Sequence, residues 1–157
     1  MIKILSFLGM GLILLSACQS LPQPLAMAVI NSWQEALNKG DIERALSYVA
    51  EDASVTISPA GPEGDAVFHG HAEIRGWYDT LVGAKGITTL SNCRITGARV
   101  TCLDSYTDDG LKAMGIAALK GEWAGAIRGG KIQSYTFTTS QESLAELTAA
   151  MAAATQR

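Results

Sequence analysis

Residues 92–102, Asn-Cys-Arg-Ile-Thr-Gly-Ala-Arg-Val-Thr-Cys, constrain the fold more than any other stretch of the chain. Glycine is favoured at the first loop position of a type II′ turn, so Gly97 and Ala98 are predicted to form a two-residue hairpin loop. Counting outward from this loop places Cys93 opposite Cys102, in a non-hydrogen-bonded pair where the two backbones come closest. A disulfide can form there with little strain. We therefore predict a bond between the two cysteines and an oxidising compartment, because disulfides are rare in the cytosol.

The N-terminal segment has the pattern of a secretory signal peptide. Lys3 supplies a positive charge, and residues 4–15 form an apolar run too short to span a bilayer comfortably. The string Leu-Ser-Ala-Cys that ends at Cys18 resembles the lipobox of bacterial lipoproteins, in which the cysteine sulfur is acylated and the chain is cut just before it. The alternative is an ordinary signal peptide with a chance cysteine. An acylated Cys18 leaves Cys93 and Cys102 as the only cysteines able to pair.

These motifs give the expected organisation of the chain. The expected segments are a signal peptide (1–17), a lipidated cysteine with an extended tether (18–24), one folded domain (25–140) and a C-terminal helix (141–157). Gln19 rather than aspartate follows the cysteine, and in lipoproteins of double-membraned bacteria this implies the outer membrane. The expected location is therefore the cell envelope, with the domain facing the periplasm and the lipid membrane as a partner through acylated Cys18.

Length and charge limit the other possible partners. The chain has 157 residues, of which 48% are hydrophobic and 17% charged, so one domain with a packed core is expected. Twelve Lys and Arg against fifteen Asp and Glu give a net charge of -3. Because such a chain has no overall basic field to hold phosphate backbones, nucleic acid is not expected as a partner.

The hydrophobic period changes along the chain from that of helices to that of strands. Apolar residues recur every three to four positions in the first half, and beyond Gly86 they alternate with polar ones. The predicted elements are helices at 25–39, from 42 after a cap at Asp41, and from 70; a strand at 55–57; a loop at 59–65; strands at 87–96, 99–107, 117–127 and 131–139; a helical turn at 108–115; and a helix at 142–155. In the last hairpin, a turn at residues 129–130 pairs Ile127 with Ile132 and puts Glu122 and Tyr135 on one face.

This order of elements, together with four short strings, resembles the SnoaL-like branch of the nuclear transport factor 2-like superfamily over residues 25–139. The strings are Gly-Asp-Ile-Glu-Arg-Ala-Leu at 40–46, Glu-Asp-Ala at 51–53, His-Gly-His-Ala-Glu-Ile-Arg at 69–75 and Gly-Lys-Ile at 130–132. The resemblance implies an α+β fold, in which a cone-shaped, curved antiparallel sheet packs on three helices and encloses a pocket. The superfamily hosts isomerases, dehydratases, cyclases, epoxide hydrolases and members without known activity, so the fold alone assigns no reaction.

Three residues are candidates for acid-base catalysis. Asp104 and Tyr106 share a strand face, and if that face lines the cone, a carboxyl of raised pKa and a phenol would point into an apolar pocket. The alternative is that this face is open to water near residues 108–109. Glu122 lies in mid-strand on the same predicted face as Tyr135, and it could equally pair with a cation at the sheet surface.

Other possible chemistry has less support in the sequence. Many SnoaL-like enzymes carry an acidic residue on the last strand, some five residues past the Gly-Lys-Ile turn. Here residues 135–138 are Tyr-Thr-Phe-Thr, which counts against a cyclase-type or isomerase-type mechanism. His69 and His71 resemble a metal-binding pair, but Gly70 begins a helix between them, so surface or capping roles are predicted. No metal and no cofactor are expected.

The predicted pocket wall consists of large apolar and aromatic side chains. The candidates for ligand contact are Trp33, Trp77, Leu111, Met114, Trp123 and Tyr135, with Leu111 and Met114 on a turn expected across the mouth. Three functions follow: a binder of a small, largely apolar molecule that does not transform it, a cofactor-independent acid-base enzyme, or an interaction domain that dimerises through an exposed sheet face. A purely apolar pocket favours the first, a carboxylate converging with a second polar group favours the second, and a filled core favours the third.

Overall fold

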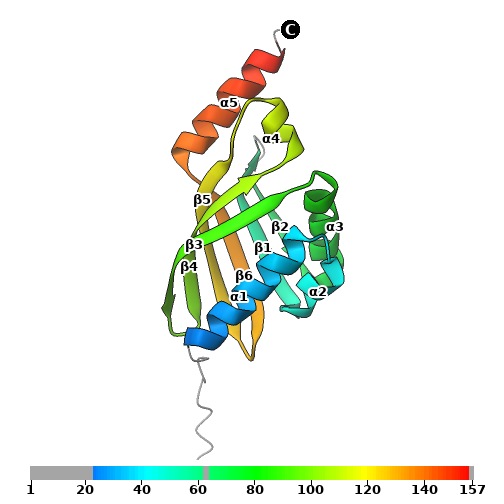
Figure 1. Ribbon diagram of the computed structural model, residues 1–157, viewed down its shortest axis with the longest axis vertical. Helices are drawn as coiled ribbons and strands as arrows, with labels where there is room; N and C mark the ends of the chain where they lie inside the picture. The colour runs from blue at the N-terminus through cyan, green and yellow to red at the C-terminus, as the bar shows by residue number, and fades with distance from the viewer. Residues whose placement is uncertain (1–22, 62–63, 156–157) are drawn as a thin grey trace, which may run out of the picture.

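The six strands form one strongly curved sheet in the order β2-β1-β6-β5-β4-β3 (Figure 1). The structure, a computed structural model, describes residues 23–61 and 64–155. The strands are β1 (Val49–Gly61), β2 (Gly64–His69), β3 (Ile87–Thr96), β4 (Arg99–Thr107), β5 (Leu119–Arg128) and β6 (Lys131–Thr139). Neighbouring strands are antiparallel except β1 and β6, which run parallel. The predicted signal peptide, Cys18 and most of the tether lie outside the described residues.

Helices cover one face and one end of this sheet. They are α1 (Gln23–Asn38), α2 (Ile42–Ser47), α3 (Gly70–Gly83), α4 (Asp109–Ala113) and α5 (Gln141–Thr155). Helix α1 crosses the sheet, and α2 and α3 lie beside it on the side of β1 and β2. Helix α5 extends from the end of the molecule opposite to the start of α1 (Figure 1). The predicted α+β fold with a curved sheet packed on helices is confirmed. No helix in the described part of the chain has both the length and the apolarity needed to cross a membrane.

Burial of one face explains why α1 forms where it does. Ile30, Trp33 and Leu37, spaced three and four residues apart, are 0%, 2% and 5% exposed and share the helix face turned to the sheet. They meet Tyr78 of α3 and Trp123 of β5 in one apolar cluster. Such burial supplies most of the stability of a helix in a folded protein, because isolated helices of this length are marginal in water.

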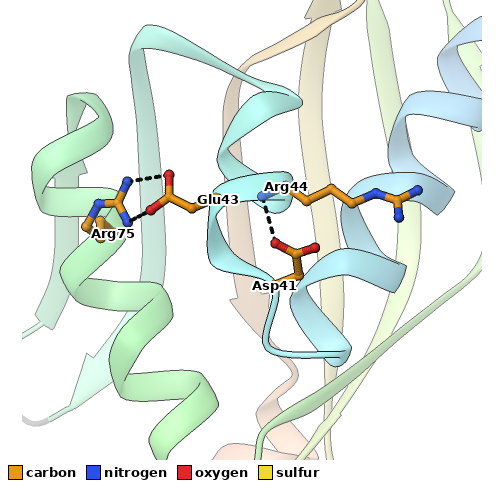
Figure 2. A network of polar contacts seen from close by, with 4 residues as sticks. All are labelled: Asp41, Glu43, Arg44 and Arg75. Atoms are coloured by element: carbon orange, nitrogen blue, oxygen red, sulfur yellow. Dashed lines mark hydrogen bonds and ion pairs between the residues drawn. The ribbon is translucent and has the colours of Figure 1, made fainter.

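Polar contacts set the position of the short helix α2. The Asp41 side chain accepts a hydrogen bond from the Arg44 backbone N–H at 3.1 Å, which caps the helix as predicted. Glu43 binds both terminal nitrogens of the Arg75 guanidinium, joining α2 to α3 (Figure 2). Because both side chains are exposed, this ion pair aligns the two helices and adds little to stability.

Two strand features differ from the predictions. Residues 59–65 were expected to be a loop, but β1 continues to Gly61 and forms a hairpin with β2. In the last hairpin Ile127 pairs with Ile132 as expected, and the register then shifts by one residue, so that Gly125 pairs with Tyr135. The extra residue is Gln133, a β-bulge that reverses the face of every later side chain on β6 relative to the prediction.

The structure contains the disulfide between Cys93 and Cys102, with their Cα atoms 4.1 Å apart. The predicted register holds from Thr96 opposite Arg99 to Arg94 opposite Thr101. Beyond the bond, β3 bulges before Ser91 pairs with Leu103. The cross-link therefore fixes the half of the hairpin that is next to its turn.

Replacing both Cys93 and Cys102 with serine is expected to lower the free energy of unfolding by about 2 kcal/mol, because the bond restricts a short loop in the unfolded chain. Urea denaturation of the variant and of the unreduced wild type measures this difference. A matched check is wild type treated with reductant, which should lose the same amount. Two reactive thiols at these positions in the unreduced protein would contradict the bond.

Candidate functional site

A cavity of about 220 Å³ lies inside the cone, between the inner face of the sheet, α1, α3 and α5. Most of its wall is apolar and comes from distant parts of the chain; examples are Trp33, Ile57, Trp77, Leu81, Trp123 and Phe137. Ala60 and Leu144 line the cavity and are exposed, so it reaches the surface at the end of the molecule where α5 begins. The polar side chains of its wall are Thr88, Asp104, Tyr106, Tyr135 and Thr139.

Trp33 is the centre of an aromatic cluster in the wall. Its ring centroid lies 5.3 Å from that of Tyr135 and 6.0 Å from that of Trp123. Its Nε1 donates a hydrogen bond to the Tyr78 hydroxyl at 2.8 Å, and this oxygen lies 3.5 Å from the Tyr135 hydroxyl. Burial raises the pKa of Tyr78 to about 12 and the pKa of Tyr135 well above its usual value. Both phenols are therefore protonated at neutral pH, and the Tyr135 phenol lies in the wall of the cavity.

Asp104 is the carboxyl in the cavity wall, and it is 7% exposed. The Thr88 hydroxyl donates a hydrogen bond to its Oδ1 at 2.7 Å. Burial raises the pKa of Asp104, although bonds from Thr88 and from backbone N–H groups partly oppose this. The face of β4 that carries Asp104 therefore lines the cone and is not open to water.

Tyr106 lines the same cavity, but its hydroxyl is already bonded. It donates to Asp108 Oδ2 at 2.9 Å, and burial together with this acidic partner raises the pKa of Tyr106. Asp108 also accepts a hydrogen bond from the Leu111 backbone N–H at 2.7 Å, capping α4. Tyr106 thus links the cavity wall to α4, and its hydroxyl proton is already used in the bond to Asp108.

Leu111 and Met114 do not line the cavity, although they were expected at its mouth. The Asp109 N–H donates to the Ala84 carbonyl at 3.0 Å, and Lys85 Nζ lies 2.8 Å from Asp109 Oδ2. These contacts hold α4 beside the connection between α3 and β3. Leu111 is buried there, while Met114 is 37% exposed.

Glu122 and the two histidines also lie away from the cavity. Glu122 is exposed on the outer face of the sheet, opposite Leu103 and Thr138, because the bulge at Gln133 separates its face from that of Tyr135. The His69 N–H donates to the Glu73 carboxylate, and His71 Nε2 lies 3.0 Å from the Val49 carbonyl oxygen. Within residues 23–61 and 64–155, no group of three or more His, Cys, Asp or Glu side chains is placed to hold a metal ion.

Residues 30–106 match the family model of the SnoaL-like domain. The chain carries a SnoaL-like domain. This domain belongs to the nuclear transport factor 2-like superfamily, whose members include ketosteroid isomerase and cyclase-like enzymes. Among curated proteins, none matches the chain.

Solved structures share the fold of this SnoaL-like domain at low sequence identity. A protein of unknown function with a cystatin-like fold from Methylobium petroleophilum has a TM-score of 0.65 and 16% identity, over 78% of this chain and 80% of that one. A protein from Kribbella flavida described as a candidate ketosteroid isomerase has a TM-score of 0.61 and 14% identity, over 75% and 79%. SalBIII, an epoxide hydrolase/cyclase-like enzyme of salinomycin pyran ring formation, has a TM-score of 0.63 and 17% identity, over 77% and 95%.

Sequence reasoning missed the contribution of α5 to the site of the SnoaL-like domain. Leu144 and Leu147, spaced three residues apart on one face of α5, line the cavity. Ser143 is 3% exposed, and its hydroxyl accepts a hydrogen bond from the Lys120 N–H at 2.9 Å, which ties the first turn of α5 to β5. The leucine spacing in an otherwise alanine-rich helix was the available signal for a buried face.

Replacing Asp104 with asparagine in the SnoaL-like domain is expected to favour the variant over wild type more at neutral pH than at acidic pH, as measured by the free energy of unfolding. Burial raises the pKa of Asp104 above its unfolded value, so the native state holds this proton more tightly than the unfolded state. As pH rises from the unfolded pKa through the native pKa, wild type loses the stability that this proton contributes. The variant does not, because asparagine cannot ionise.

The measurement is the free energy of urea unfolding of wild type and Asp104→Asn at pH 4 and pH 8. The difference between the two proteins should move in favour of the variant at the higher pH. Asp52→Asn is the control, because that carboxyl is exposed. A difference that is the same at both pH values, or that moves toward wild type, would contradict the assignment.

Proposed function

We propose that the cavity binds a small, largely apolar molecule that carries one polar group. The observation that carries this proposal is a cavity walled by aromatic and aliphatic side chains, with the buried carboxyl of Asp104 in the same wall. Concave apolar sites with a few fixed polar groups are the usual form of small-molecule sites. The apolar part of the ligand packs against Trp33 and Trp77, and its polar group meets Asp104.

The chemistry of Asp104 limits that polar group. Burial raises the pKa of Asp104, because the apolar wall penalises a charged group. Tyr135 lies in the same wall, and its hydroxyl donates to the Tyr78 hydroxyl at 3.5 Å. A neutral ligand with a hydroxyl group suits this wall better than a charged ligand.

A second candidate function is cofactor-independent acid-base catalysis on the same molecule. It is favoured by one observation: Asp104 and the Tyr135 phenol face the same cavity, and burial raises the pKa of both groups. Enzymes of this fold also include a candidate ketosteroid isomerase and an epoxide hydrolase/cyclase-like protein. Asp104 is the residue that we assign to proton transfer in this reading, because Glu122 lies outside and the Tyr106 hydroxyl is bonded to Asp108.

The third function expected from sequence, a dimerising interaction domain, has less support. It was to be favoured by a filled core, and the core instead contains a cavity of about 220 Å³. A homodimer remains a prediction.

We also propose that the chain is a lipoprotein of the cell envelope, anchored through an acylated Cys18, in the outer membrane facing the periplasm. The string that ends at Cys18 supports the anchor, and the disulfide between Cys93 and Cys102 supports an oxidising compartment. Intact-mass analysis of the protein from its host membrane tests the anchor. An unmodified Cys18 would overturn it.

Solvent extraction of the full chain, purified from its own envelope, tests ligand binding. We expect mass spectrometry to find a stoichiometric apolar compound in wild type and to find it depleted in Leu147→Asp, which places a charge in the cavity wall. Leu103→Asp is the matched control, since Leu103 is 54% exposed on the outer face of the sheet. Equal amounts in both variants, or none in wild type, would overturn the proposal.

The extracted compound then separates the two candidate functions. Wild type that returns the compound unchanged after incubation supports a binder. Conversion by wild type that is lost in Asp104→Asn, while that variant still binds the compound, supports the enzyme.

A further inference from the structure

We propose that one end of the cone rests on an anionic lipid surface, so that the mouth of the cavity faces away from the membrane that holds the chain. We call this surface the hairpin end; it consists of the tips of the β3–β4 and β5–β6 hairpins, residues 94–99 and 128–131. The mouth end is defined by Ala60, Thr139 and Leu147. The proposal rests on the anchor at Cys18 proposed above.

The described chain begins at the hairpin end. Pro24 and Met27 of α1 line one shallow groove together with Cys93, Arg94 and Ile95 of β3. The two hairpin tips are joined there, because the Ile127 N–H donates to the Ala98 carbonyl at 2.8 Å. Figure 1 shows the start of α1 and both tips at one end of the long axis, with α5 at the other end. A chain tethered before α1 is therefore held by its hairpin end.

The exposed charges of the hairpin tips are all positive. The four cations are Arg94, Arg99, Arg128 and Lys131. No carboxylate in the described part of the chain lies within 4.0 Å of their charged nitrogens. Along these four strands the acidic residues are Asp104 and Glu122, five and six residues from the nearest of the cations, which is about 17 to 20 Å of strand.

The neighbouring charges define the limits of this basic surface. Glu51 and Asp52 lie on β1, near its start, so the surface covers the tips of two hairpins and not the whole end. Lys131 also donates to the Ser47 carbonyl, which fixes its position against α2. At the mouth end, two of the lysines, Lys85 and Lys112, are paired with Asp109. The two ends therefore differ in the charge that they offer to a surface.

The length of the tether excludes an inverted arrangement. Gln23 is five positions after Cys18 in the chain, and these five steps span at most about 17 Å. Strand β4 alone is about 30 Å long, and α5 adds about 22 Å beyond it. With Cys18 in the bilayer, the mouth cannot turn toward that bilayer, although the domain could still lie on its side. Cations are attracted to anionic leaflets, so the four cations favour the upright arrangement.

Energy transfer from the protein to lipid headgroups tests the orientation. The lipidated full-length mature chain, with a donor dye on Thr96→Cys or on Ala153→Cys, is reconstituted with rhodamine-headgroup acceptor into vesicles of phosphatidylcholine alone or with about one-third phosphatidylglycerol. Thr96 is at a hairpin tip and Ala153 is exposed on α5. We expect transfer in anionic vesicles to be at least about twofold higher from position 96. Equal transfer from both positions would overturn the proposal.

Matched substitutions identify the charges responsible. Arg94→Gln, Arg99→Gln and Arg128→Gln together should remove most of the difference in transfer, and raising the salt concentration to about 0.5 M should do the same to wild type. Lys85→Gln, Lys112→Gln and Lys120→Gln together should leave it unchanged. A difference that resists both the hairpin substitutions and salt would overturn the role of these cations.

Flotation with neutral vesicles separates this proposal from the one on which it rests. A chain that does not float with phosphatidylcholine vesicles lacks the lipid anchor, and both proposals fail. A chain that floats with them but shows no orientation in anionic vesicles keeps its anchor, and the orientation alone fails.

Discussion

Replacing Trp33 with alanine is expected to lower the free energy of unfolding by about 4 kcal/mol. Trp33 is 2% exposed, and its ring contacts those of Tyr78, Trp123 and Tyr135. Truncation of a buried tryptophan removes its apolar contacts and leaves a cavity that the surroundings fill only in part. The Tyr78 hydroxyl also loses the N–H that donates to it at 2.8 Å, inside the core.

Chemical denaturation measures this loss, and Trp77→Ala is the matched control. Trp77 is half-buried and stacks on Phe68 with ring centroids 5.3 Å apart, so the same truncation should cost less there. Trp33→Phe separates the ring from its hydrogen bond and should cost about 1 to 2 kcal/mol. A loss below about 1 kcal/mol for Trp33→Ala would mean that this ring does not hold the core together.

Replacing Gly125 with alanine is expected to lower the free energy of unfolding by about 3 kcal/mol. A Cβ atom at this position would lie 2.3 Å from Trp123 Cη2 and 3.0 Å from the Ser134 carbonyl oxygen. The Trp123 ring must therefore move, and the Tyr135 ring stacked on it at 5.4 Å leaves little room for that. Overpacking a closely packed core typically costs 1 to 3 kcal/mol, and here the displaced ring is itself part of the cavity wall.

The control for Gly125→Ala is the same change at Gly76, on the exposed face of α3. A Cβ atom at Gly76 meets no atom within 4 Å, and alanine is favoured over glycine in a helix, so Gly76→Ala should raise stability by about 0.5 to 1 kcal/mol. Thermal denaturation of the two variants gives both values. If Gly125→Ala leaves the free energy of unfolding unchanged, Trp123 has room to move and the cavity wall can rearrange around the added methyl group.

Local sequence patterns were enough to predict most elements of this fold. The strands expected at 87–96, 99–107 and 131–139 coincide with β3, β4 and β6, because alternation of polar and apolar residues between glycine turns depends only on near neighbours. The opposition of Cys93 and Cys102 followed from the same count, since their hairpin keeps its register over the three pairs between the disulfide and the turn.

Features that depend on distant contacts could not be predicted in this way. The bulge at Gln133 has no signal in its own sequence, and it moved Glu122 out of the candidate site. The turn at Asp109 is held by the connection after α3, more than twenty residues earlier in the chain. Its position beside that connection therefore could not be predicted from local sequence patterns. Asp104 was identified as a candidate, but only the packed sheet shows that its face lines the cone.

The parallel pairing of β1 with β6 also fixes when the molecule can fold. Val55 pairs with Tyr135, eighty positions later in the chain, and the cavity needs Leu147 later still. A chain that emerges from its N-terminus presents β1 and β2 long before β6, and a lone two-stranded hairpin is marginally stable in water. Long-range pairing of this kind slows folding and prolongs exposure of apolar surface. An unfinished chain therefore lacks a complete cavity, whose wall is closed only after synthesis of the last helix.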